Sequence, residues 1–266
     1  MNSPRRASLL MMVLLGAMPA AAQSTSAPGD GAELVTDRPD FTESSQVMDR
    51  GWFQFESGVS YEGDGGDLRS LTVPSALMRI GLGHQTELRI GADGLLSERM
   101  GGIRASGHSD IEIGAKTSLI RQGTTAFDLA VIPMVSLPIG AERFTSGGVD
   151  PTLKVTWGKD LRAGFGLAGN VNLSSLSDDT GRFHQEAVSL SLGHALVRGW
   201  SGYAEVFGFS RLAPGESAAW TVNGGTTFAL GQHGQFDLEV GRGLTAAAPD
   251  WFIGAGLTIR GAFGDQ

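Results

Sequence analysis

The feature that most constrains this chain is an alternation of apolar and polar residues with a period of two, which runs across residues 51–263. In the stretch WFQFESGVSYE, Phe53 and Phe55 fall on one face of an extended chain, and Gln54 and Glu56 fall on the other. The period of about 3.6 residues that marks an amphipathic helix is absent from this region. The pattern therefore predicts β-strands from one end of the region to the other.

The alternating segments number about twelve, and several are longer than the roughly 5–6 residues usual for a strand of a soluble protein. They fit the strand of about ten residues that crosses a membrane at a tilt. The segments are 51–62, 69–82, 86–95, 108–121, 125–137, 150–158, 162–176, 184–197, 200–212, 218–230, 234–245 and 250–263.

The connections between these segments alternate in length. Tight turns and longer links in such an order are typical of outer-membrane barrels, whose periplasmic turns are short and whose outer loops are long. An even number of strands also places both chain ends on the periplasmic side. Tight turns are expected at 83–85, 158–160 and 198–199, and longer links at 63–68, 96–107, 138–149, 177–183 and 213–217.

Twelve antiparallel strands could also form a soluble sandwich or a soluble barrel. The membrane barrel is favoured by the leader described below, by the unequal links and by aromatic residues near the strand ends, where interfacial girdles are expected. We therefore predict an all-β fold, an antiparallel up-and-down transmembrane β-barrel of about twelve strands. Its apolar face would contact outer-membrane lipid, and its charged face would surround a lumen.

The first 22 residues have the features of a cleaved Sec-type signal peptide. Arg5 and Arg6 precede an apolar stretch from Leu9 to Met18, and alanines follow it. Removal of this leader and its two arginines changes the formal net charge from −8 to −10. A net negative charge argues against a nucleic-acid partner, because nucleic acid binds basic surfaces. The expected organisation is a signal peptide (1–22), an N-terminal periplasmic or plug segment (23–50) and a barrel (51–263).

The stretch TDRPDFTESS (36–45) is charged and has no period. Pro39 disfavours helical geometry at the residue before it. Our hypothesis is that the stretch enters or caps the periplasmic mouth of the barrel and pairs with charged wall residues. The alternative is a solvated tether that only leads to the first strand. The hypothesis involves Asp37, Arg38, Asp40 and Glu43 in the segment, and Arg79, Arg89, Lys116 or Arg260 on the wall.

The polar face of the strands carries charges of both signs. These charges could set the selectivity of a lumen, or they could form ion pairs that hold the barrel together. Both interpretations remain open from the sequence. The candidate lumen residues are Glu87, Arg89, Glu112, Lys116, Asp237 and Arg260, with Arg79.

The opening TDRPDFTESS, the following GWFQFESGVSYE and the closing QFDLEVGRGLTAAAPDWFIGAGLTIRGAF resemble a bacterial outer-membrane transporter family labelled for the MetA pathway of phenol degradation. The resemblance covers nearly the whole chain after the leader. It implies an outer-membrane barrel that passes small molecules, aromatic ones among them. Phe263 near the C-terminus resembles the aromatic signal read by the barrel-assembly machinery, although three residues follow it here.

No catalytic, cofactor or metal site is predicted. GFGLAG (164–169) matches a dinucleotide-binding spacing but lies within an alternating segment, without the helix that such a site requires. The function expected from the sequence is that of a passive channel or transporter for small solutes. Two alternatives remain: a non-conducting structural barrel and, less favoured, an outer-membrane enzyme.

Overall fold

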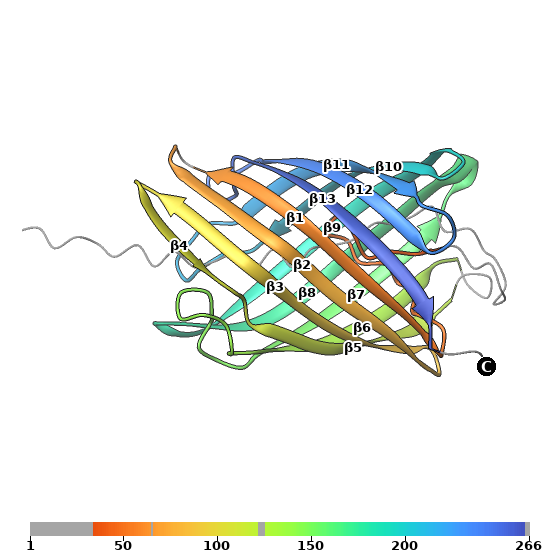
Figure 1. The fold of residues 1–266 in the computed structure, drawn as a ribbon, viewed down its shortest axis with the longest axis horizontal. Helices are drawn as coiled ribbons and strands as arrows, with labels where there is room; N and C mark the ends of the chain where they lie inside the picture. The colour runs from red at the N-terminus through yellow and green to blue at the C-terminus, as the bar shows by residue number, and fades with distance from the viewer. Residues whose placement is uncertain (1–33, 65, 122–125, 264–266) are drawn as a thin grey trace, which may run out of the picture.

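The chain forms a closed antiparallel β-barrel in a computed structural model that describes residues 34–64, 66–121 and 126–263 (Figure 1). Each strand pairs with its neighbours in the sequence, except that β4 and β5 both pair with β3, and the first strand also pairs with the last. The strands are β1 (Trp52–Asp64), β2 (Leu68–Gly83), β3 (Thr86–Met100), β4 (Ile103–Gly107), β5 (Ile111–Ile120), β6 (Asp128–Leu137), β7 (Asp150–Asp160), β8 (Phe165–Asp178), β9 (Gly181–Val197), β10 (Trp200–Phe209), β11 (Ala219–Ala229), β12 (Gly234–Gly243) and β13 (Trp251–Ala262).

The barrel has twelve strand positions, because β4 and β5 share one of them. Both pair with β3: β4 lies along its C-terminal end, and β5 along its N-terminal end. The predicted fold class, an up-and-down barrel of about twelve strands, is confirmed. A short 3₁₀ turn at Arg162–Gly164 joins β7 to β8. Among the described residues, no helix is long and apolar enough to span a membrane.

The two faces of the strands differ as the alternation predicts. On β13, Ile253, Leu257 and Ile259 point outward and are each about half exposed, whereas Thr258 between them is fully buried. Large apolar side chains are exposed in the same way on most other strands. A continuous apolar exterior of this kind is suited to lipid, in which a sheet must close so that every backbone polar group is paired.

Two of the links expected to be long are tight turns. The chain turns at Gly101 and Gly102 between β3 and β4, and at residues 179–180 between β8 and β9. Gly101 and Gly102 both have positive φ angles, 56° and 82°, the conformation that a two-residue hairpin turn needs. The prediction of loops at 96–107 and 177–183 is therefore wrong, because the strands extend through most of these residues.

The barrel has two different ends. At one end, called here the terminal end, β1 begins, β13 finishes, and the turns between β2 and β3 and between β9 and β10 are short. The opposite end, called the loop end, carries the links 138–149, 210–218 and 244–250. Residues 34–50, called the lumen segment, lie inside the barrel except for Asp49 and Arg50, which are exposed (Figure 1). The predicted signal peptide, 1–22, and residues 23–33 lie outside the described residues.

Candidate functional site

The lumen segment is an irregular chain that the barrel wall encloses. It contains neither helix nor strand, and Thr36, Asp37, Asp40 and Thr42 have no exposed surface. A buried irregular chain must find hydrogen-bond partners for its backbone outside itself. In this barrel the inward-facing polar side chains provide them.

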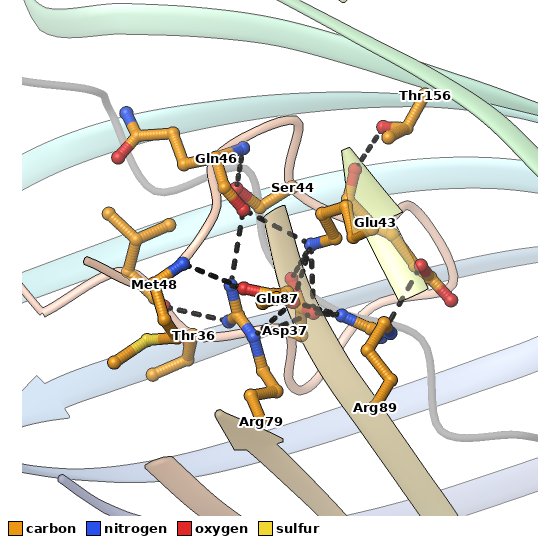
Figure 2. A network of polar contacts seen from close by, with 12 residues as sticks. Thr36, Asp37, Glu43, Ser44, Gln46, Met48, Arg79, Glu87, Arg89 and Thr156 are labelled. Carbon is orange, nitrogen blue, oxygen red and sulfur yellow. Dashed lines mark hydrogen bonds and ion pairs between the residues drawn. The ribbon is translucent and has the colours of Figure 1, made fainter. Parts of the chain in front are cut away.

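Asp37 lies at the centre of a group of three basic wall residues (Figure 2). The Lys116 ammonium donates to both carboxylate oxygens of Asp37 at 3.0 Å. Arg89 also donates to this carboxylate, and Nε of Arg79 lies 3.3 Å from it. Burial alone would raise the pKa of Asp37, but the charges of Arg79, Lys116 and Arg89 outweigh it and hold the pKa below its ordinary value.

Arg79 connects the wall to the lumen segment at several points. Its guanidinium forms a two-pronged ion pair with Glu87, at 2.9 and 3.0 Å, and a further hydrogen bond to Glu56 at 3.2 Å. It also donates to the backbone carbonyls of Val35 and Gln46. Such fork-shaped pairs fix orientation as well as charge.

Arg38 contacts a different part of the wall, on β1, β12 and β13. It donates to Asp237 at 3.2 Å and to the carbonyl of Ala255 at 3.3 Å. Its guanidinium lies over Gly58 and Gly256, which are paired across β1 and β13. A Cβ atom at either glycine would overlap the guanidinium, so the missing side chains create the space that Arg38 occupies.

The middle of the segment is bound by Glu205 on β10. One carboxylate accepts from the backbone N–H of Phe41 at 2.7 Å, from the N–H of Thr42 at 2.7 Å and from the Thr42 hydroxyl at 2.6 Å. The Phe41 ring stacks on Phe207, with 4.7 Å between ring centroids, and meets Phe209 edge-on. This is the main apolar contact of the segment.

Glu43 and Asp40 have contrasting surroundings. Glu43 pairs with Lys154 at 2.6 Å and with Arg89 at 3.4 Å. Asp40 accepts a hydrogen bond from Ser191 at 2.6 Å, and no ion pair among the described residues includes it. Burial, together with the like charge of Glu205, raises the pKa of Asp40 well above its ordinary value.

A cavity of about 450 Å³, called the outer cavity, lies between the lumen segment and the loop end. Arg38, Phe41 and Glu43 form its floor, and it extends to the exposed turn at Asp179. Its volume is within the range of about 300–1,000 Å³ found for small-molecule pockets. On the terminal side of the floor, the wall residues that contact the segment are almost fully buried.

The structure brings most of the predicted residues together. Asp37, Arg79, Glu87, Arg89 and Lys116 form one network, and Arg38 joins Asp237. Two predicted residues lie elsewhere. Glu112 lines the outer cavity, and Arg260 stacks over the Trp52 ring, 5.3 Å from its centroid, near the terminal end.

Sequence reasoning did not single out Glu56, Glu205 or Phe41. The two carboxylates lie on inward-facing strand positions and so belong to a class that the alternation defines. That Glu56 and Glu205 are the carboxylates that bind the segment depends on contacts with it, and the alternation pattern does not specify these contacts. Among the described residues, no cluster of histidine, aspartate or glutamate side chains could hold a metal ion.

Comparisons with known proteins agree with this architecture. The family described as "Putative MetA-pathway of phenol degradation" matches residues 36–261. Two solved structures are similar in fold: a NanC porin, with a TM-score of 0.53 and 6% identity, and a KdgM porin in complex with disordered oligogalacturonate, with a TM-score of 0.53 and 8% identity. Each comparison covers 78% of this chain and 98% of the porin. No curated protein gives a match.

Proposed function

The chain belongs to the MetA-pathway family of phenol degradation, as its opening and closing motifs predicted, and we propose that it is a passive channel for small molecules, aromatic ones among them, in the Gram-negative outer membrane. The proposal includes no catalytic step. The observation that carries it is the outer cavity, a space within the barrel that is large enough for a small molecule and reaches the loop end.

The lumen segment is the part that controls passage in this proposal. It fills the terminal half of the lumen with buried side chains, so a solute can cross only when the segment shifts. Ion pairs and hydrogen bonds to the wall supply most of its attachment, and Phe41 supplies the main apolar contact. Polar contacts of this kind can be exchanged for contacts with water when the segment moves.

The orientation follows from the ends of the barrel. The terminal end would face the periplasm and the loop end the outside, as in barrels with short periplasmic turns. Export through the Sec pathway and recognition of Phe263 by the barrel-assembly machinery complete the proposal. The Phe263 ring packs against Phe53, 4.9 Å between centroids, and its N–H donates to the carbonyl of Gly51.

The second candidate function is a non-conducting structural barrel. One observation favours it: the group of Asp37, Arg79, Arg89 and Lys116 is fully buried and densely paired, which would suit a permanent seal. In this alternative the same segment would only hold the wall together.

Liposome swelling with neutral solutes of graded size separates the two candidates. We expect slow swelling with the intact chain and faster swelling, with a larger size limit, when residues 34–45 are deleted. Single-channel conductance should rise in parallel, and Gly58→Ala, which displaces Arg38 without removing charge, gives a second test. Absence of swelling in all three proteins, each shown to be folded by faster gel migration before boiling than after, would support the structural barrel.

A further inference from the structure

The charged residues that line the outer cavity are mostly acidic. Nine carboxylate side chains and four basic side chains line it. Three of the four basic residues are already ion-paired: Arg38 with Asp237, Arg89 with Asp37, and Lys154 with Glu43. The fourth, Arg143, is exposed on the link 138–149. The cavity therefore presents a surplus of negative charge to whatever enters it.

Two carboxylates on neighbouring strands form the centre of this surplus. Glu112 on β5 is paired in register with Gly91 on β3, and Asp93 lies two residues further along β3 on the same inward face. Such diagonal neighbours are about 7–8 Å apart. Asp93 is 6% exposed, and no ion pair among the described residues includes either carboxylate. Lys154, which attracts Glu112, is held by Glu43 at 2.6 Å.

Unsatisfied hydrogen-bonding atoms in the cavity wall give independent support. Glu112 and Asn172 line the cavity, and Oε2 of Glu112 and Oδ1 of Asn172 are buried without a hydrogen-bond partner. Asn172 is only 7% exposed. Both atoms are acceptors, and an acceptor buried without a partner is costly. A ligand that supplies donors would remove this cost, and one that brings only acceptors would increase it.

The opposite side of the cavity is apolar. Phe41 on the lumen segment and Phe209 on β10 both line the cavity and contact each other edge-on, with 5.2 Å between their ring centroids. In the strand order, β10 and β5 are separated by four strands on one side of the barrel and by more on the other, so the aromatic and acidic walls face across the lumen. One cavity thus joins a carboxylate pair to an aromatic surface.

We propose that the outer cavity binds small organic cations, with a protonated amine facing Asp93 and Glu112 and an apolar or aromatic body against Phe41 and Phe209. This names the solute class of the channel and so rests on the proposed function. The ammonium group supplies both the positive charge and the donors that the wall lacks. The amine exchanges hydration water for carboxylate contacts, and no covalent step is involved.

Three probes of nearly the same shape test the proposal: benzylamine, benzyl alcohol and benzoate. Their binding to the full chain without its leader, purified in detergent, is measured by isothermal titration calorimetry at neutral pH. Benzylamine should bind about tenfold or more tightly than benzyl alcohol, and benzoate should bind most weakly. Equal affinities, tighter binding of benzoate or no binding of benzylamine would overturn the proposal.

Variants assign the binding to the wall residues. The double variant Asp93→Asn with Glu112→Gln should reduce the affinity for benzylamine about tenfold and leave that for benzyl alcohol unchanged. Phe209→Leu should weaken both ligands. Glu186→Gln is the matched control, because Glu186 is an exposed carboxylate on the outward face of β9. Unchanged benzylamine affinity in the double variant, with its fold verified by gel migration, would refute the assignment.

The result is separable from the channel proposal. Calorimetry in detergent reports binding without passage, and liposome swelling reports passage without a requirement for binding. Swelling without selective amine binding would support the channel proposal and refute the cation site. Amine binding without swelling would support the cation site and refute the channel proposal.

Discussion

The two halves of the lumen are built from the same strands but use their charges differently. In the terminal half, Asp37 of the lumen segment joins Arg79, Arg89 and Lys116 of the wall in one buried network. In the outer half, Asp93 and Glu112 line the outer cavity. Inward-facing charge therefore has two settings in one barrel: in one half it binds the chain's own segment, and in the other it lines a cavity.

The largest effect on docking of the lumen segment is expected from a change at Asp37, the carboxylate at the centre of the buried network. Asp37→Ala leaves three buried cations without their shared carboxylate, and removal of one partner from a buried ion pair costs about 3–5 kcal/mol. The undocked population of the segment should therefore rise more than about a hundredfold. Because the chain has no cysteine, Ser45→Cys provides a single buried thiol whose maleimide labelling reports undocking.

Asp179→Ala is the control for this prediction. Asp179 is an exposed carboxylate at the loop end, so its removal should leave the labelling rate unchanged. If Asp37→Ala labels no faster than the parent, the terminal half is not held by its ion pairs and the contrast between the halves fails.

A smaller effect is expected from a change that adds volume and removes no charge. Gly58→Ala places a Cβ in the space of the Arg38 guanidinium and separates Arg38 from Asp237. Overpacking of this kind costs about 1–3 kcal/mol. Faster Ser45→Cys labelling is expected, whereas Gly202→Ala, where the nearest atom to a new Cβ lies at an ordinary 3.5 Å, should behave like the parent.

The smallest effect is a dependence on pH that originates at Asp40. Its pKa is raised in the docked segment by burial and by the charges of Glu205 and Glu239, so docking is strongest when Asp40 is protonated. This contribution is complete below the ordinary pKa of about 4 and is lost as pH rises through the raised value. Asp37 acts in the opposite sense, because its lowered pKa stabilises docking only above about pH 4.

Between pH 5 and pH 8, undocking should therefore increase with pH. The measurement is Ser45→Cys labelling normalised to the unfolded chain at each pH. Asp40→Asn keeps the side-chain shape without the charge and should reduce the dependence. A slope that is unchanged in this variant would assign the titration to another group.

The sequence predicts the barrel well because lipid and lumen impose opposite requirements on alternate residues. The alternation in QFDLEVG places Asp237 inside and Leu238 outside, as the structure does. Link lengths were harder to predict, since Gly101 and Gly102 can belong either to a loop or to a hairpin turn, and only the pairing of Met100 with Ile103 decides between them.

The candidate site could be predicted in part. The composition of TDRPDFTESS indicated a segment in need of charged partners, and Arg79, Arg89 and Lys116 were available on inward positions. The identity of each pair depends on the tilt and stagger of the strands, which no local pattern contains. For this reason Arg260, which is equally basic and also inward-facing, lies apart beside Trp52.

The position of the lumen segment directly before β1 links the filling of the barrel to its assembly. The seam that completes the cylinder is the β1–β13 pair, and Arg38 crosses that seam at Gly58 and Gly256. If β1 and β13 pair after the segment has docked, the barrel closes around Arg79, Arg89 and Lys116 when they already have carboxylate partners. If the strands pair earlier, these cations are buried without the Asp37 carboxylate. The segment thus favours one order of events during biogenesis, and a defect in it would first be seen as a reduced yield of mature protein.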